Sequence, residues 1–434
     1  MTRPFRPAGT SWSEGREGGR LSIVVHDFAG HAFTAQLARE LARCGHRVDY
    51  VSCAAFASPK GETGDRTDDP PGFRAHPLGR GSHIDKDNLA RRFLQERSYG
   101  MAAARFLRSL EADVVLSANA PVIVQTALAR AARRSGAAFV AWVQDLHADA
   151  LMALVGRRHP LIAGLLAALA RLAERRWLAG ADGVILIDEI FRDRLAGRPW
   201  HLALPQATIT PNWSAMPGAA EPPDPRRPSR PRRRPRLVYA GTLARKHDPA
   251  LLLDLAADVD ADLVVHAEGS NADWLAAEAA RLDLCSLRVL PWAPVEALPA
   301  LLAEADVLIA LLDPVAAGWS IPSKILTYMA AGRPILAAMP AANPAARLLR
   351  ETGAGLVVEP ADRIGFLDGV RRLIGDADLR ETLGRNGRQH AQEAFAIGPI
   401  AGAFERDLRR AIDRRVALEG RPLAARGRGR LLPS

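Results

Sequence analysis

The chain has 434 residues, which is enough for two domains of about 200 residues each. Hydrophobic residues make up 48% of it, so two buried cores are possible and a disordered protein is excluded. The formal net charge is +10, and residues 226–236 alone contain seven arginines. We interpret this run as a solvated linker, with contact to an anionic membrane surface as the second interpretation. Nucleic-acid binding is the least favoured, because no interleaved aromatic residues or known binding module accompany the charge.

The N-terminus and the cysteines indicate the compartment. Residues 1–20 lack the apolar core of a secretory signal, and no apolar run approaches the ~20 residues of a membrane span. The three cysteines show neither metal-ligand spacing nor an obvious disulfide framework. We therefore expect a cytoplasmic protein whose residues 1–20 form a disordered tail.

From residue 21 onward, short β-rich segments alternate with helical patterns. The expected elements are strands at 21–27, 47–52, 113–117, 138–143 and 183–187, and helices at 33–44, 88–110, 122–134 and 160–179. Residues 55–72 are rich in Gly, Pro and Asp, which favours a mobile loop. The β-α-β order is typical of a parallel sheet with helices on both faces. It predicts an N-terminal Rossmann-like domain over residues 21–212.

Residues 213–235 interrupt this order with proline and arginine and predict an interdomain linker. A second series then follows, with strands expected at 236–240, 262–266, 287–290, 306–312, 334–338 and 355–358, and helices at 249–257, 272–282, 295–304, 322–331, 344–351, 362–374 and 378–395. This series predicts a second doubly wound domain over residues 236–395. A charged helix at 396–418 and a disordered tail at 419–434 are expected to end the chain.

Ligands bind at the carboxyl ends of the strands in such sheets, so the loops there are the candidate site. The first loop of the second domain contains Gly241, Thr242, Arg245 and Lys246. Glycine allows a ligand to approach closely, and the two cations suit a diphosphate. Ser323 and Lys324 begin a later helix, whose free amides and dipole favour an anion. Each loop alone could be an ordinary turn or helix start, but two on one sheet predict a phosphate site.

Two further residues follow strands of the second domain. Glu268 could hold a sugar hydroxyl, with a plain loop carboxylate as the alternative. Trp292 could stack on a nucleobase, with a core or rim aromatic as the alternative. The Asp-x-Asp pattern at 258–262 precedes a strand, which places it at the opposite end of the sheet. We therefore expect no metal site there.

The second domain also resembles a known family. Val238-Tyr-Ala-Gly-Thr-Leu-Ala-Arg-Lys-His-Asp-Pro and Ser320-Ile-Pro-Ser-Lys-Ile-Leu-Thr-Tyr-Met-Ala-Ala-Gly resemble glycosyltransferase family 4, in particular its colanic-acid and O-antigen type branch with a Pro-Ser-Lys motif. The resemblance covers most of residues 21–395 and is weaker in the first half. It implies an α/β protein of GT-B architecture, in which two doubly wound Rossmann-like domains face each other across a cleft. A nucleotide-sugar donor in the C-terminal domain, an acceptor in the N-terminal domain and no metal or other cofactor are further implications.

The resemblance assigns roles to particular residues. Lys246 would contact the donor diphosphate, Ser323 and Lys324 would line the donor site, and Gly30-His31 would form an N-terminal loop that reaches into the cleft. The sequence also departs from the family pattern, with Trp319 and Thr327 in place of two glutamates, Thr242 in place of an arginine and Gln144 in place of a histidine. The glutamate expected to hold the donor ribose is thus missing.

The acceptor hydroxyl needs a base or an orienting partner. Asp145 is the first candidate, His31 the second and His147 a weaker third, although Asp145 could simply cap a helix. Sugar transfer in cell-surface or exopolysaccharide biosynthesis is the function expected. A polyprenyl-linked sugar would suit the apolar segment 161–170, which is followed by arginines and could touch a membrane.

Three other functions remain open. A non-catalytic nucleotide-sugar-binding protein and a nucleotide-sugar epimerase would share the fold. A nicotinamide-dependent dehydrogenase is less favoured, because only Gly30 follows the first strand where Gly-x-Gly-x-x-Gly is needed.

Overall fold

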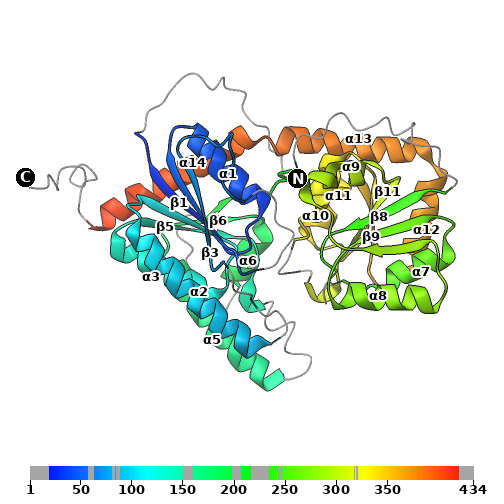
Figure 1. Cartoon of the computed structure of the whole chain (residues 1–434), viewed down its shortest axis with the longest axis horizontal. Helices are drawn as coiled ribbons and strands as arrows, with labels where there is room; N and C mark the ends of the chain where they lie inside the picture. The colour runs from blue at the N-terminus through cyan, green and yellow to red at the C-terminus, as the bar shows by residue number, and fades with distance from the viewer. Residues whose placement is uncertain are drawn as a thin grey trace, which may run out of the picture.

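The computed structural model describes residues 19–56, 63–80, 84, 88–149, 160–197, 207–216, 234–243, 247–316, 318 and 321–419. The chain forms two α/β lobes side by side, each built on one parallel sheet (Figure 1). Arg245, Lys246 and Trp319 lie outside the described residues, as do most of the expected linker and both expected tails.

The N-terminal sheet has seven parallel strands in the order β3-β2-β1-β4-β5-β6-β7. Their bounds are Ser22–Asp27 (β1), Arg47–Cys53 (β2), Phe73–Leu78 (β3), Val114–Ala118 (β4), Ala138–Val143 (β5), Gly183–Leu186 (β6) and Thr208–Ile209 (β7). The central strands are buried along almost their whole length, as a sheet covered on both faces requires.

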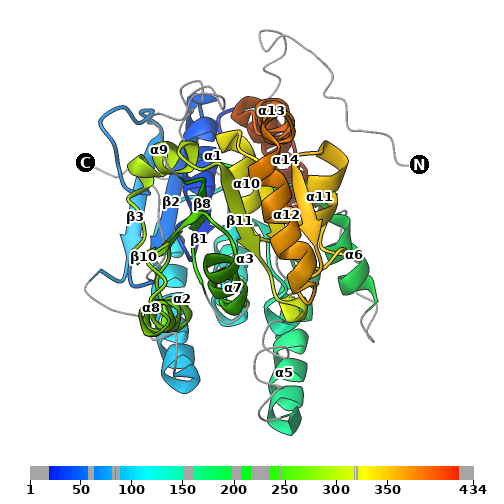
Figure 2. The same cartoon turned by 90° about the vertical axis from the view of Figure 1, so that its right-hand side faces the viewer.

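Helices cover both faces of this sheet (Figures 1 and 2). One face carries α1 (Ala32–Arg43) and the last helix of the chain, α14 (Ile397–Glu419). The other carries α2 (Leu89–Ser109), α3 (Val122–Ser135) and α5 (Pro160–Ala179). The short helix α6 (Glu189–Ala196) follows β6.

The C-terminal sheet has six parallel strands in the order β10-β9-β8-β11-β12-β13. Their bounds are Arg236–Ala240 (β8), Asp262–His266 (β9), Leu287–Leu290 (β10), Val307–Leu311 (β11), Ile335–Ala338 (β12) and Gly355–Val358 (β13). The first strand of each sheet lies in its interior, and the strand order reverses beside it. Such a switch point is where open α/β sheets bind ligands.

Two groups of helices enclose the C-terminal sheet (Figure 1). One group comprises α7 (Ala250–Asp258), α8 (Ser270–Arg281) and α12 (Arg363–Gly375). The other comprises α9 (Leu298–Ala303), α10 (Lys324–Ala331), α11 (Pro344–Thr352) and α13 (Ala377–Ala394). Short 3-10 turns at Val295–Ala297 and Pro314–Ala316 precede α9 and α10. No helix among the described residues is long and apolar enough to cross a membrane.

The two doubly wound sheets confirm the expected fold class, but three elements were not anticipated. Strand β7 and helix α6 are short, and β3 contains a proline, so the three sequences carry a weak local signal. β3 falls directly after the segment expected to be a mobile loop. Part of that segment is anchored instead, because Arg39 forms a buried ion pair with Asp69 at 2.5 Å.

The expected linker begins later than residue 213. Trp213 is 2% exposed and stacks on Trp142 at 5.7 Å with an interplanar angle of 10°. Its indole Nε1 donates to the side-chain oxygen of Gln36. This residue therefore belongs to the core of the N-terminal lobe.

Helix α14 returns from the C-terminal lobe to cover the N-terminal sheet. Its Phe404 is fully buried and lies 4.7 Å from Trp142 and 6.1 Å from Trp213, measured between ring centroids. Helix α14 is thus part of the N-terminal core.

We expect Phe404→Ala to lower the free energy of unfolding of the N-terminal lobe by about 3–5 kcal/mol, because it removes a fully buried ring. Urea denaturation followed by tryptophan fluorescence would measure this change. Leu418→Ala, at a residue of the same helix that is 73% exposed, is the matched control. Equal stabilities of the two variants would contradict the packing described.

Candidate functional site

The two loops predicted to bind phosphate lie together at one end of the C-terminal sheet. Gly241 follows β8 with a φ of +127°, which strongly favours glycine. A Cβ at Gly241 would lie 3.5 Å from Cε and 3.6 Å from Nζ of Lys324, the first residue of α10. Gly241, in the loop after β8, and Lys324, at the start of α10, thus meet at the carboxyl end of the central strand.

The ring of Tyr239 positions the Lys324 ammonium. Nζ of Lys324 lies 3.6 Å from the centroid of that ring, in cation–π geometry. The Tyr239 hydroxyl donates to the main-chain oxygen of Thr242 at 2.8 Å, which fixes the loop after β8. Burial raises the pKa of Tyr239 well above its usual value, so this phenol stays neutral and remains a donor.

A second tyrosine joins α10 to the same strand. The hydroxyl of Tyr328 accepts a hydrogen bond from the amide of Ala240 at 2.8 Å and donates to its carbonyl at 3.1 Å. Both groups are buried, so losing either bond would leave a polar backbone group unpaired. The start of α10 is therefore held in register with the end of β8.

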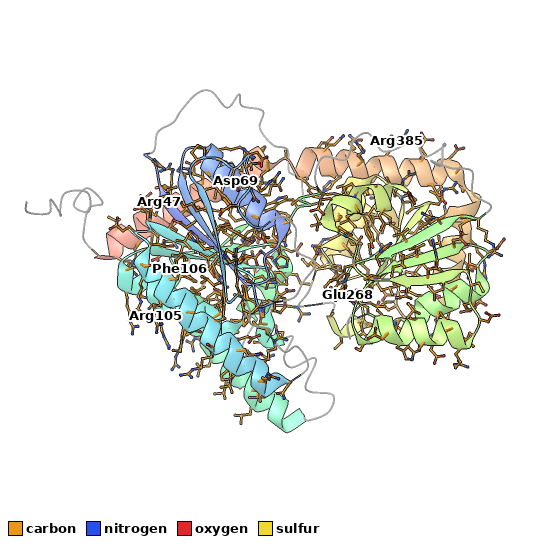
Figure 3. All side chains as sticks on the ribbon, viewed as in Figure 1. Arg47, Asp69, Arg105, Phe106, Glu268 and Arg385 are labelled. Atoms are coloured by element: carbon orange, nitrogen blue, oxygen red, sulfur yellow. The ribbon has the colours of Figure 1, made fainter. Side chains whose placement is uncertain are left out.

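The remaining candidates of the donor loops differ in position. Thr242 and Ser323 are exposed, and the Ser323 side chain makes no capping hydrogen bond to α10. Glu268 and Trp292 follow the neighbouring strands β9 and β10, and the amide of Trp292 donates to Oε1 of Glu268 at 3.4 Å. Glu268 lies on the side of the C-terminal lobe that faces the N-terminal lobe (Figure 3). The structure thus gathers the described donor candidates at one edge of the sheet.

In the N-terminal lobe, His31 is held by a residue that the sequence analysis did not select. Nδ1 of His31 lies 3.1 and 3.0 Å from the two carboxylate oxygens of Asp27, the last residue of β1. Asp27 also accepts from the amides of Ala29 and His31 and from the hydroxyl of Thr34. The signal in the sequence was a histidine four residues after an aspartate that ends a strand. Gly30, with a φ of +73°, makes the turn that brings the two side chains together.

The electrostatics of this pair suit a charged carboxylate. Burial on its own would raise the pKa of Asp27, but the charge of His31 and the hydrogen bonds from His31 and Thr34 lower it to about 2. The side chain of Asp27 is fully buried, whereas that of His31 is 33% exposed. The arrangement resembles the His–Asp pair of catalytic sites, in which an ionised carboxylate orients the imidazole through Nδ1.

A neighbouring histidine has a different character. His26 is fully buried and bonded to Ser117 and Tyr99, and burial lowers its pKa to about 4 despite the charge of Asp27. It is therefore neutral at physiological pH and belongs to the core.

Asp145 and His147 lie on the same edge of the N-terminal sheet. Asn119 follows β4, and its side-chain Nδ2 donates to Oδ2 of half-buried Asp145 at 3.0 Å. His147 is half-buried, with Nδ1 3.3 Å from the main-chain oxygen of Asp145, while Gln144 is 5% exposed. The three candidate bases thus follow β1 and β5, which flank β4. Only His31 has a carboxylate partner among its described contacts.

Contacts between the lobes join the carboxyl edges of the two sheets. The hydroxyl of Ser214, after β7, donates to that of Thr327 on α10 at 3.4 Å. Asp188, after β6, forms a 2.8 Å ion pair with Arg347 on α11. A Cβ at Gly318 would overlap the guanidinium of Arg194 on α6, so this glycine admits a side chain from the other lobe. Thr327, which replaces an expected glutamate, therefore contributes to the interface.

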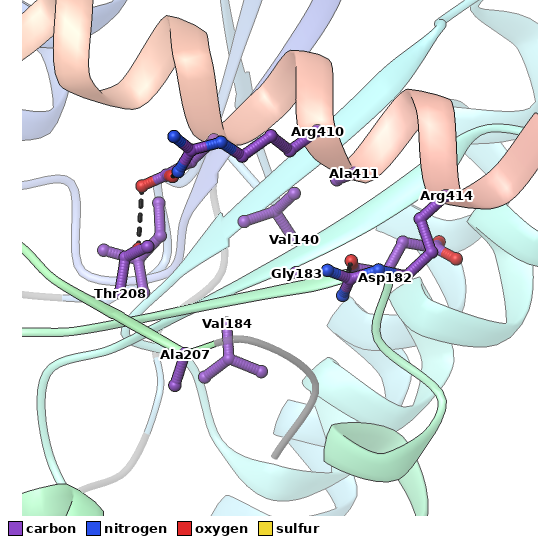
Figure 4. A pocket seen from close by; sticks show the side chains of 11 residues that line it. Val140, Asp182, Gly183, Val184, Ala207, Thr208, Arg410, Ala411 and Arg414 are labelled. Atoms are coloured by element: carbon purple, nitrogen blue, oxygen red, sulfur yellow. Dashed lines mark hydrogen bonds and ion pairs between the residues drawn. The ribbon is translucent and has the colours of Figure 1, made fainter.

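A small cavity of about 120 Å³ lies away from this site (Figure 4). It lies between α14 and strands β5 to β7, beside the hydrogen bond from Thr208 to Asp407. Gly183 and Thr208, which line it, begin their strands. This position at the amino-terminal edge separates the cavity from the candidate residues that the structure describes.

Comparison with protein families gives two matches. Residues 29–213 match the model of the glycosyl transferase 4-like domain, and residues 234–376 match that of glycosyl transferases group 1. No curated protein sequence matches the chain significantly.

Solved structures share the architecture. Sucrose-phosphate synthase from Thermosynechococcus elongatus aligns over 91% of this chain and 100% of its own, with 18% identity and a TM-score of 0.71. Anabaena Alr3699/HepE in complex with UDP-glucose aligns over 90% and 100%, with 14% identity and a TM-score of 0.64. A glycosyltransferase from Rickettsia africae aligns over 91% and 99%, with 12% identity and a TM-score of 0.60. These proteins therefore share the GT-B architecture with this chain, although their sequence identity to it is low.

Proposed function

The chain belongs to the glycosyltransferases of GT-B fold, and on that premise we propose that it transfers a hexosyl group from a nucleoside-diphosphate sugar to an acceptor hydroxyl. The observation that carries this proposal is the meeting of Gly241 and Lys324 at the end of β8. Binding of UDP-glucose by the Anabaena protein on the same fold favours a nucleotide-sugar donor here.

The reaction breaks the bond between the anomeric carbon and the diphosphate, and the diphosphate leaves with the electron pair. The acceptor oxygen bonds to the same carbon and loses its proton. The Lys324 ammonium and the first amides of α10 would stabilise the charge that grows on the diphosphate. His31, oriented by Asp27, would take the proton through Nε2.

For the donor's other parts, Trp292 is the proposed contact for the base and Glu268 for a hydroxyl. Arg245 and Lys246 would add positive charge on the Gly241 loop. Since the proposed charge stabilisation comes from side chains and amides, we expect activity to survive EDTA. Loss of activity in EDTA, restored by a divalent cation, would contradict this proposal.

A polyprenyl-linked sugar is the acceptor that we propose, in cell-surface or exopolysaccharide biosynthesis. The resemblance to the colanic-acid and O-antigen type transferases supports this pathway. It also favours a protein that works at the inner face of a membrane.

Incubation with radiolabelled nucleotide-sugars and a polyprenyl-diphosphate sugar tests the function. We expect label to enter the lipid fraction for at least one donor. An epimerase would convert its donor without any acceptor, and a binding protein would release no nucleotide. Either result would overturn the proposal.

A further inference from the structure

Helices α2, α3 and α5 form an outer layer on one face of the N-terminal sheet, with α3 in the middle. Helices α2 and α5 extend beyond the body of the lobe as two projections (Figure 2). Each of these helices exposes large apolar side chains to solvent. Together, α2 and α5 carry seven of the twelve large apolar side chains that are exposed among the described residues.

Helix α5 carries a continuous apolar stripe on its solvent side. Leu165, Leu169 and Leu172 are 64%, 56% and 37% exposed, and their spacing of four and three residues aligns them along the helix. Leu166 lies beside them and is 41% exposed. The next residue of the same row is the exposed Arg176. The opposite side of the helix is buried through Ala167, Trp177 and Leu178.

Helix α2 also exposes large apolar side chains. Phe93 and Leu94 are 54% and 61% exposed near its start, and Met101 follows at 51%. The exposed residues that come later on the same side include Arg105 and Arg108, and Arg105 points away from the body of the lobe (Figure 3). On α5 the exposed arginines follow the apolar residues, whereas on α2 the exposed Arg91 and Arg97 are interspersed with the apolar residues.

The charge of the layer has a single sign. Every exposed charged side chain among the described residues of α2, α3 and α5 is an arginine: Arg91, Arg97, Arg105, Arg108, Arg130, Arg133, Arg134, Arg175 and Arg176. The two acidic residues of these helices, Glu96 and Glu174, are buried. Exposed apolar side chains together with arginines and no exposed carboxylate are typical of a surface that binds a bilayer interface, where acyl chains lie below anionic headgroups.

The orientation of the layer relative to the candidate site also suits the proposed reaction. In a β-α-β unit the helix starts at the carboxyl edge of the sheet, so the exposed leucines of α5 lie towards the edge that carries His31 and Asp145. We propose that the outer layer docks this protein on an anionic membrane surface. A second copy of the chain is a poorer occupant, because two such layers would bring arginines of like charge together.

This inference deepens the proposed function, since it would place a lipid-linked acceptor beside the cleft. Its test needs neither donor nor acceptor. The full-length protein is sedimented with vesicles of phosphatidylglycerol and phosphatidylcholine, and with vesicles of phosphatidylcholine alone. We expect strong binding only to the anionic vesicles, weakening as salt is raised.

Two variants test the surface against matched controls. Leu165→Ser with Leu169→Ser, and Arg97→Gln with Arg105→Gln, should each weaken vesicle binding about tenfold or more. Ile364→Ser, at a 75% exposed residue of α12, and Arg372→Gln with Arg385→Gln in the other lobe should leave it unchanged. Nucleoside-diphosphate binding should be the same in all of them, which separates failed docking from a failed enzyme.

Three results would overturn docking. They are the absence of vesicle binding, equal binding of the surface variants and their controls, and a lipid-free dimer that the leucine variants convert to a monomer. The last result would assign the layer to self-association.

Discussion

Replacing His31 with alanine should lower kcat by about 100- to 10,000-fold, which is the usual contribution of a general base. The affinity for nucleoside diphosphate should stay unchanged, because His31 belongs to the lobe opposite the proposed donor site. Single-turnover transfer from a labelled donor, with calorimetry of nucleotide binding, measures both quantities.

His147→Ala is the matched control, since the one hydrogen bond described for this half-buried histidine is to the main chain of Asp145. We expect it to keep most of the activity. Asp27→Asn should lower kcat without weakening nucleotide binding, because the amide cannot supply the charge that orients His31. Full activity of His31→Ala, together with loss of activity in Asp145→Asn, would make Asp145 the base instead.

Replacing Lys324 with alanine should lower kcat/KM by about 100- to 1,000-fold, because it removes a preorganised positive charge from the leaving diphosphate. Tyr239→Phe is its control, since it keeps the ring face under Nζ and removes only the hydroxyl bonded to Thr242. This control should retain activity within about tenfold. Initial rates over a range of donor concentrations separate the two variants. Similar losses in both would mean that the loop conformation, and not the lysine charge, limits the reaction.

Much of the fold could be predicted from local patterns. Strands β5 and β8 are apolar runs and α5 is a long apolar segment, which are strong local signals, and the ends of all three were predicted to the residue. β7 has two residues, and its pairing with β6 is a tertiary contact without a local signal. Trp213 was assigned to the linker because its neighbours are proline-rich. Its burial depends on Phe404, which lies far along the chain.

The sequence predicted those parts of the site whose positions follow from the topology of the sheet. Parallel strands bring their carboxyl ends to one edge, which is why the loops of Gly241 and Lys324 could be expected to meet. The tyrosines that fix them were not identified, because Tyr328 acts on a strand 88 residues away. Asp27 was missed for a different reason. It ends a strand after which only Gly30 and His31 were considered, and its contact with His31 requires the turn at Gly30.

Titration calorimetry of a panel of nucleoside diphosphates against the wild type and Lys324→Ala tests the central claim most directly. The account predicts that at least one of them binds the wild type, and that the variant binds it about tenfold more weakly or worse, since a charge-assisted contact is lost. Equal affinity in the two proteins, with both fully folded, would show that the diphosphate is not held between β8 and α10.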